Sequence, residues 1–262
     1  MTIAWTCLVC LLLGGRESAK KEEPPKVPVH RLDLKSGCLR GILLSNSETS
    51  DKVWILELSG KITRMERSRI SWLEKEGDER VCNLPAMALV EGLDAEELEV
   101  QDTCEQLLTR MGDPAAEALQ SALKSKSRET LRRSLRALTK NVQPKLRSSI
   151  ASLLSHADEH VRKEALAAYG ATRPKDLLER SRKALRDSSA RVRHEAIAQI
   201  ESTKDLRAVD SLLEMLEDED ERSLRMQVFA SLRRLTGRRL GQDEAAWRAW
   251  WTNHREEVML GG

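Results

Sequence analysis

The chain has 262 residues and a net charge of +2; 33% of its residues are charged and only 3% are aromatic. A Leu-rich, aromatic-poor composition indicates a mostly helical protein and argues against a β-sandwich, whose strands need β-branched and aromatic residues. It also argues against the platforms that stack single-stranded nucleic acid on aromatic rings, and the small net charge gives no overall attraction to DNA or anionic lipid. The length allows about two domains.

Residues 1–19 have the pattern of a signal peptide. An apolar run over residues 3–15 is too short for an ordinary membrane span of roughly 20 residues, and a charged run follows it. No Lys or Arg precedes the run and the cleavage site is poor, so an uncleaved anchor or a misassigned start codon is the alternative. We expect an exported chain, periplasmic or extracellular, with no membrane span in its mature part.

A Pro-rich linker, residues 20–29, precedes five short runs of alternating apolar residues within residues 30–75. Five strands in so short a segment can close only as a small, strongly bent barrel, and Gly41 lies where a strand must bend. We expect Trp54 and Trp72 to fill the barrel core, because the segment has no other large side chains. The order of apolar strands and Gly turns resembles the SH3-like and Sm-like barrels.

After a second linker, residues 76–93, the two-residue period gives way to a helical repeat. Four leucines recur at one constant spacing, namely Leu123, Leu154, Leu185 and Leu216. One turn earlier the same spacing gives Leu119, Ile150, Ser181 and Leu212. A second helix in each unit starts at an apolar residue, at Val100, Leu131, Val161, Val192 and Leu224. Neither helix can bury its apolar face alone, so stacking of the units must supply the core.

The repeat over residues 94–257 resembles the HEAT-repeat family, in the short bacterial form with the Val-Arg-x-x-Ala signature described in phycocyanobilin lyases. Its best copies start at Val161 and Val192. The resemblance implies a mainly α fold, a right-handed α-solenoid of about five two-helix repeats, here preceded by the small five-stranded β-barrel. Tetratricopeptide and ankyrin landmarks do not recur in the chain. We expect a monomer.

The last helical segment departs from the repeat. Trp247, Trp250 and Trp251 are spaced to share one helix face, and Trp247 continues the leucine series one repeat beyond Leu216. Asp243 is a plausible N-cap for this helix. A solenoid needs a distinct cap at its open end, so we interpret this segment as a cap rather than as an aromatic ligand site.

Residues 156–160, His-Ala-Asp-Glu-His, fit a zinc-peptidase signature that requires one continuous helix through both histidines. The repeat instead places the start of a helix there, with Asp158 as its N-cap, so we predict no metal site. The body of the chain has no cysteine framework for disulfides, and we expect Cys104 to be a buried thiol on the inward face. We predict no catalytic residue and no cofactor.

Charge is the remaining functional signal. Residues 124–186 carry 17 Lys or Arg against 6 Asp or Glu, whereas residues 201–221 carry 2 against 9. We expect the arginines that follow the apolar helix starts to be structural, pairing with carboxylates or helix ends of neighbouring repeats; these are Arg132, Arg162, Arg193 and Arg225. The candidates for partner binding are Arg133, Arg136, Arg147, Lys163, Arg180 and Lys183.

The favoured function is a non-catalytic scaffold that binds a protein partner through the solenoid surface, and the basic segment favours an acidic partner. One alternative is binding of nucleic acid or another polyanion by residues 124–186, which the leader argues against. A more distant alternative is a lyase-type enzyme, suggested only by the name of the repeat, since no residue supports that chemistry. Solvated helix faces are the ordinary explanation of such charge runs.

Overall fold

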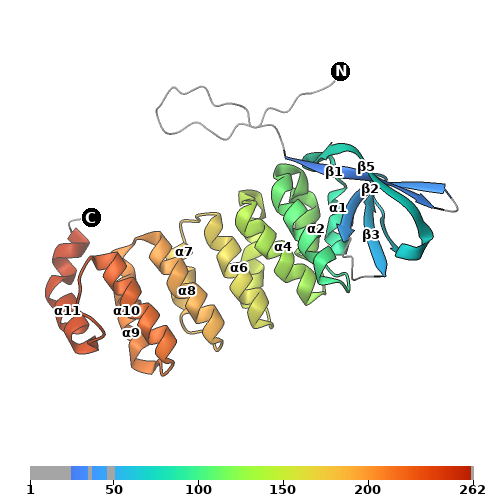
Figure 1. Cartoon of the computed structure of the whole chain (residues 1–262). Coiled ribbons are helices and arrows are strands. Elements are labelled where there is room, and N and C mark those ends of the chain that lie inside the picture. Colours follow the sequence, from blue (N-terminus) through green and yellow to red (C-terminus); the bar gives the residue numbers. More distant parts are fainter. Residues whose placement is uncertain (1–24, 35–36, 46–50, 261–262) are drawn as a thin grey trace, which may run out of the picture.

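The computed structural model describes residues 25–34, 37–45 and 51–260, and it shows a β-sheet at one end of an elongated stack of helices (Figure 1). The predicted signal peptide, residues 1–19, lies outside the described residues. Within those ranges, no helix combines the length and the apolar character needed to cross a bilayer.

The five predicted strands are present and form one antiparallel sheet in the order β4-β3-β2-β1-β5. Their bounds are β1 Lys26–Leu34, β2 Gly37–Ser45, β3 Lys52–Glu57, β4 Ile62–Glu66 and β5 Ile70–Arg80. The closed barrel is a wrong prediction, because β5 pairs with β1 along its length and no ladder joins it to the short strand β4. The sheet nevertheless curls, so that Ile70 and Leu73 pack on the same cluster as Val53 and Met65.

The sheet extends beyond the predicted range of residues 30–75. Strand β1 takes in residues 26–29 of the expected linker, because Val27 and Val29 alternate inward and are buried. The second expected linker, residues 76–93, contains the end of β5 and the helix α1 (Ala86–Gly92).

Neither tryptophan of the sheet lies in the curled interior, contrary to prediction. Trp72 is 60% exposed, and Trp54 is half-buried between the sheet and the helices, with the Arg64 guanidinium 5.6 Å from its ring centre. Aliphatic side chains already fill the interior, among them Leu32 and Ile55, so no space for an indole remains.

In the described part of the chain the helices form five pairs, α1/α2 to α9/α10, followed by the single helix α11. After α1, their bounds are α2 Leu98–Met111, α3 Ala116–Ala122, α4 Arg128–Lys140, α5 Arg147–Ser152, α6 Glu159–Ala171, α7 Leu177–Ala184, α8 Ala190–Thr203, α9 Val209–Asp218, α10 Arg222–Thr236 and α11 Glu244–Leu260. Each long helix packs on the next, α2 on α4, α4 on α6, α6 on α8 and α8 on α10, so they form one layer. The short helices α3, α5, α7 and α9 form the other (Figure 1).

The sheet packs against the first pair of helices and closes that end of the stack. Ile42, Leu44 and Leu56 belong to the same buried cluster as Leu89 and Val100 of the helices. Two glycines at this end permit close contacts, Gly41 between β2 and β3 and Gly92 between α1 and α2. A Cβ on Gly41 would lie 2.8 Å from the carbonyl carbon of Leu56, and one on Gly92 would clash with the Cys104 thiol.

The repeat predicts the buried stripe of the short helices correctly. Leu119, Ile150 and Leu212 are fully buried. Ser181 occupies the same stripe and is also fully buried, and its hydroxyl has no hydrogen-bond partner among the described residues. The apolar core divides near this point into two clusters: the first runs from the sheet to Leu177, and the second from Leu166 to the last helix.

Helix α11 covers the far end of the stack, as the tryptophan pattern predicts. Trp247 is 0% exposed and donates to the Gly241 carbonyl at 3.1 Å, and Trp251 donates to Asp210 at 2.7 Å. Asp243 caps the helix by accepting from the Ala246 amide at 3.0 Å.

The last helix is nevertheless not another repeat unit. It packs on α9 in the short-helix layer but runs antiparallel to it, because Arg248 near its start meets Glu217 near the end of α9, whereas Arg255 meets Asp210 at the beginning.

Candidate partner-binding groove

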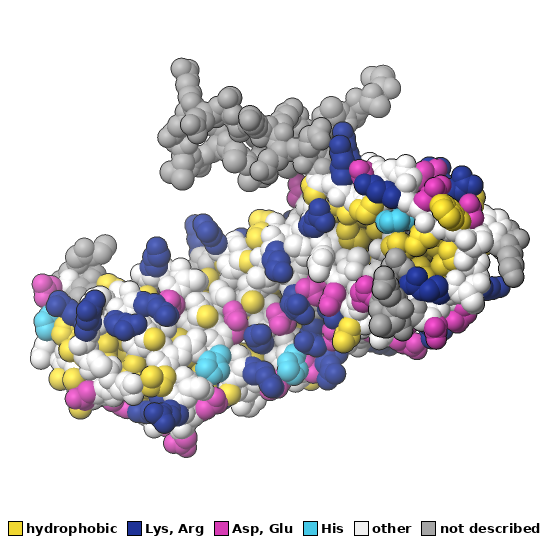
Figure 2. Space-filling view, viewed as in Figure 1, with side chains coloured by type: hydrophobic (Ala, Val, Ile, Leu, Met, Phe, Trp, Pro, Cys, Tyr) yellow, Lys and Arg dark blue, Asp and Glu magenta, His cyan; other side chains and the backbone are white. Residues whose placement is uncertain are grey.

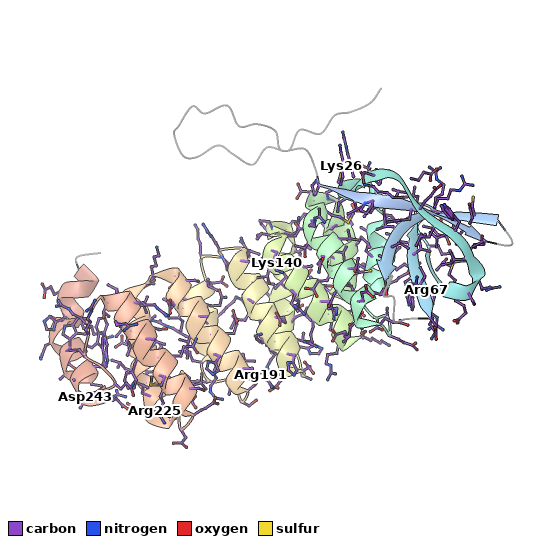
Figure 3. The ribbon with its side chains drawn as sticks, in the orientation of Figure 1. Lys26, Arg67, Lys140, Arg191, Arg225 and Asp243 are labelled. Atoms are coloured by element: carbon purple, nitrogen blue, oxygen red, sulfur yellow. The ribbon has the colours of Figure 1, made fainter. Side chains whose placement is uncertain are left out.

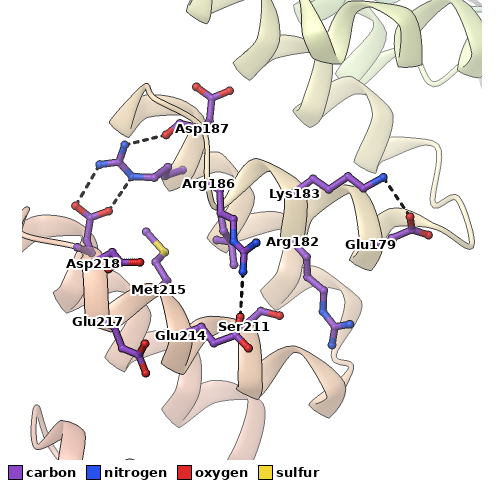
Figure 4. Close-up of a pocket in the computed structure, with 13 residues that line it drawn as sticks. Glu179, Arg182, Lys183, Arg186, Asp187, Ser211, Glu214, Met215, Glu217 and Asp218 are labelled. Carbon is purple, nitrogen blue, oxygen red and sulfur yellow. Dashed lines mark hydrogen bonds and ion pairs between the residues drawn. The ribbon is translucent and has the colours of Figure 1, made fainter.

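The described residues form a groove of about 1130 Å³ between the short helices α7 and α9 (Figure 4). One wall carries Arg182, Lys183 and Arg186 from α7 and the residues just after it. The other carries acidic residues of α9, Glu214, Glu217 and Asp218, with Met215 between them. We call this feature the charged groove. Its two walls have opposite charge.

The outer parts of both walls are solvent-exposed. The side chain of Lys183 is 77% exposed and pairs with Glu179 at 3.3 Å, and that of Arg186 is 84% exposed and meets Glu214 at 3.4 Å. Exposed ion pairs of this kind contribute little to stability. A partner can therefore exchange these pairs for its own at small cost.

The floor of the charged groove is fixed by largely buried pairs instead. Arg193 donates twice to Glu219, at 2.7 and 3.1 Å, and once to the Asp187 carbonyl at 3.0 Å. One repeat earlier, Arg162 forms the same bidentate pair with Asp187, at 2.7 and 2.8 Å. Burial alone would raise the pKa of Asp187, but the bonds from Arg162 and from the Ser189 amide, with the nearby charges of Arg162 and Arg193, together hold that pKa below its ordinary value.

These pairs confirm the structural role predicted for three of the four arginines that follow the helix starts. Arg162 and Arg193 each bond carbonyls at the end of the preceding short helix and a carboxylate of the next repeat. Arg225 does the same with the Glu219 carbonyl and with Glu244 of α11. Arg132 differs, since its carboxylate is Glu129 of its own helix.

Two of the six predicted binding residues lie between α2 and α4. Arg133 is buried and bonds three carboxylates, Asp102 at 2.7 Å, Glu105 at 3.0 Å and Glu129 at 2.8 Å. Burial favours its neutral form, but the bonds to Asp102 and Glu129 raise its pKa. It is a structural residue and not accessible to a partner. Arg136 is partly exposed and meets Glu105 at 3.3 Å.

The other four are divided between both layers. Arg147 donates to the hydroxyl and the carbonyl of Thr172 at the end of α6, which is a structural contact. Lys163 lies on α6 in the long-helix layer. Arg180 pairs with Asp176 at 2.6 Å and lies 4.9 Å from the Tyr169 ring centre. Lys183 alone lies in the charged groove.

The predicted basic segment, residues 124–186, therefore does not form one continuous basic surface. Its cations are spread over the two layers, and its C-terminal end faces the acidic segment, residues 201–221, across the charged groove. The sequence shows both charge runs, but the pairing of their helices follows only from the fold. Arg182, Arg186 and Glu217 were thus missed as site residues, although the constant repeat spacing already places α7 beside α9.

The histidine motif lies at a helix start, as predicted. Asp158 accepts from the amides of His160 and Val161 at 2.9 and 3.1 Å, and α6 begins only at Glu159. His156 lies before the helix, where its ring accepts from the Asp158 amide. Cys104 is fully buried, and burial raises the pKa of its thiol to about 12, which makes it a poor nucleophile at neutral pH.

Fold and sequence together define a class of helical-repeat solenoids. Residues 146–233 match a family model described as HEAT repeats. The structure of the complex of CpcE and CpcF of phycocyanin lyase from Nostoc sp. PCC7120 contains a similar chain, with a TM-score of 0.52 and 16% identity over 56% of this chain and 96% of that one. At this identity the likeness shows the fold alone.

Two engineered structures are also similar. A designed armadillo repeat protein in complex with the peptide (KR)4 has a TM-score of 0.41 and 19% identity, covering 58% of this chain and 82% of that one. Another, a computationally designed armadillo repeat protein for modular peptide recognition, has a TM-score of 0.38 and 20% identity, covering 57% and 82%. No curated protein is significantly similar to the chain.

Proposed function

We propose that this chain is a non-catalytic scaffold that binds a segment of a partner protein in the charged groove. The observation that carries the proposal is the arrangement of two exposed walls of opposite charge over a floor held by the Arg193–Glu219 pair. A floor that is already ordered reduces the entropy lost on binding.

The charges indicate the chemistry of the partner segment. Acidic groups would meet Arg182 and Arg186, and basic groups would meet Glu214 and Glu217. Such complementarity contributes more to association rate and specificity than to affinity. The partner expected here carries both signs of charge, which refines the expectation of an acidic one.

Export is part of the same proposal and has its own test. The apolar run of residues 3–15 supports a signal peptide. We expect intact-mass measurement of the secreted protein to show removal of the leader near residues 15–19. Recovery of only full-length chain from inside the cells would contradict export.

The groove is tested by affinity capture from cells of the native host, with quantification of each captured protein. We expect Lys183→Glu with Arg186→Glu, and separately Glu214→Lys with Glu217→Lys, to reduce capture of the specific partner at least tenfold. The matched control, Lys124→Glu with Lys126→Glu, changes two exposed cations outside the groove and should leave capture unchanged. Equal capture by the wild type and both wall variants would show that the charged groove is not the binding site.

A further inference from the structure

The ends of the long helices bring a set of exposed cations to one edge of the solenoid. Lys140 marks this edge, whereas Arg191, Arg225 and Asp243 lie at the opposite one (Figure 3). From α4 onward, each long helix ends in exposed Lys or Arg, and we call this set the basic edge: Lys140, Lys145, Arg173, Lys175, Lys204, Arg207, Arg233 and Arg234. In Figure 2 Lys and Arg side chains project along this rim.

Carboxylates do not balance this charge. Asp176 and Asp205, the acidic residues of the turns after α6 and α8, are partly buried and bonded, the first by Tyr169 and Arg180, the second by Arg207. In the part of the chain that the structure describes, six of the eight cations have no side-chain hydrogen bond or ion pair, namely Lys140, Lys145, Arg173, Lys175, Lys204 and Arg233. The basic edge thus presents unpaired positive charge to solvent.

The opposite edge has a different composition. The turns that precede the long helices mix exposed cations such as Lys124 and Arg222 with exposed anions such as Asp94 and Asp220. The contrast is therefore a property of one edge and not of the whole surface, in agreement with the small net charge.

Backbone conformation gives a second, independent observation. Arg173 and Lys204 have φ values of 47° and 55°, and they are the two non-glycine residues with positive φ among those described. Glycine with positive φ occupies the position after α2 and α10, at Gly112 and Gly237, and Gly237 is in the left-handed conformation. A side chain there is unfavourable, and such strain is most often retained at functional positions. Both strained residues are cations of the basic edge.

The N-terminal part of the chain enters the described structure at this same edge. The Pro25 carbonyl accepts from the Val81 amide, and the turn at residues 81–83 contacts the turn at residues 113–115 after α2. Residue 25, at which the described part of the chain begins, therefore lies on the side where the cations gather. Val142, 40% exposed, adds an apolar side chain to the basic edge.

We infer that the basic edge contacts the surface of an anionic lipid bilayer. The turns of successive repeats form a row, spaced by about 8–10 Å per repeat, and such a row can meet a plane at several turns. Lys and Arg near an anionic surface each strengthen attachment about fivefold. The solenoid would stand on its edge, which leaves the charged groove on its short-helix face open to a partner.

The experiment measures sedimentation of the full chain with vesicles of phosphatidylcholine alone or mixed with phosphatidylglycerol. We expect binding to increase with the anionic lipid and to weaken as salt rises. Lys140→Glu with Lys145→Glu and Lys175→Glu should reduce binding to anionic vesicles at least tenfold. The control carries the same change of charge on the opposite edge, Lys124→Glu with Lys126→Glu and Arg222→Glu, and should bind like the wild type.

A second variant separates a binding role from a structural one. Arg173→Gly with Lys204→Gly relieves the left-handed strain, so we expect Tm to rise by about 2 °C while binding to anionic vesicles falls about 25-fold. Equal binding by wild type, edge variants and control would overturn the proposal. The proposal would also be overturned if the edge variants lost binding to an added DNA duplex or acidic peptide but kept binding to the vesicles. The basic edge would then bind a soluble polyanion.

Discussion

The two halves of the solenoid use different chemistry at the same position of the repeat. Five residues after each apolar helix start, the later long helices carry Leu166, Ile197 and Phe229, all buried. The first two carry Glu105 and Arg136, which pair with each other. One backbone arrangement thus accepts either an apolar or a charged contact between long helices.

The difference affects stability, because a buried ion pair is stable only while each charged group keeps its partners. Burial raises the pKa of Glu105, and Arg136 and Arg133 only partly offset that effect. Removing one member of such a set leaves an uncompensated charge, whereas trimming an apolar contact loses only packing. The halves should therefore respond differently to substitution.

The largest effect is expected at the far end of the apolar half. Trp247→Ala should destabilise the protein by about 4 kcal/mol, because it empties a fully buried site beneath the cap. Urea unfolding followed by circular dichroism measures this. Trp250→Ala, at a partly exposed ring of the same helix, is the control and should cost clearly less. Equal losses would argue against α11 as a cap.

In the charged half, Arg133→Met should cost about 3 kcal/mol, because Glu105 loses a buried partner. Met stands at the equivalent position in α10, as Met226, so the side chain is compatible with the repeat. Arg136→Met, at a partly exposed site, should cost less than about 1 kcal/mol. If the Arg133 variant matched the wild type in chemical unfolding, its carboxylate cluster would not stabilise this half.

The sheet closes the charged half of the solenoid, and a substitution in the sheet tests that closure. Gly41→Ala should cost about 2 kcal/mol, because the new Cβ meets the backbone of Leu56. Gly77→Ala, where a Cβ meets nothing within 4 Å, is the control in the same sheet. Hydrogen exchange should show faster opening of β2 and β3 in the first variant only.

A small gain in stability is expected from a substitution where the two core clusters meet. Ser181→Ala should stabilise the protein by about 1 kcal/mol, because it removes a buried hydroxyl without a partner. Thermal unfolding measures the gain. Destabilisation by this substitution would show that the hydroxyl is bonded in solution.

The smallest expected effect is a difference between the two halves in how their stability depends on pH. The pKa of Asp187 lies below its ordinary 3.8, so its contribution to stability is present above that value and is lost as pH falls through the folded pKa. The pKa of Glu105 lies above 4.5, so its contribution is present below that value and is lost as pH rises through the folded pKa. The stability of wild type relative to Asp187→Asn and to Glu105→Gln should change with opposite slopes in acid.

Sequence periodicity predicted the features that recur at the constant spacing of the repeat and involve only neighbouring repeats. It placed the buried leucines, the Arg162 and Arg193 pairs and the cap. It failed for Arg133, whose partners Asp102 and Glu105 lie on the preceding long helix at positions that other repeats fill differently. It failed for Trp72 because the register shift beside Asp33 determines which face that side chain takes.

The basic edge was missed for a related reason. Four of its cations, Lys140, Lys145, Arg173 and Lys175, belong to the basic segment 124–186, but the charge run does not show that they share an edge with the cations after α8 and α10. The charged groove, by contrast, joins two local runs, but the sequence does not say that they face each other.

The arginine pairs have a consequence for how such a chain can change its length. Arg162 reaches forward to Asp187, and Arg193 reaches forward to Glu219. Removal of one whole repeat, the segment from Lys163 to Arg193, would place Arg162 where Arg193 now stands, facing Glu219. Each forward bond would find an equivalent acceptor, and Arg225 would still meet Glu244. Gain or loss of whole units by recombination is therefore compatible with the bonding pattern, while a cut of any other length breaks it.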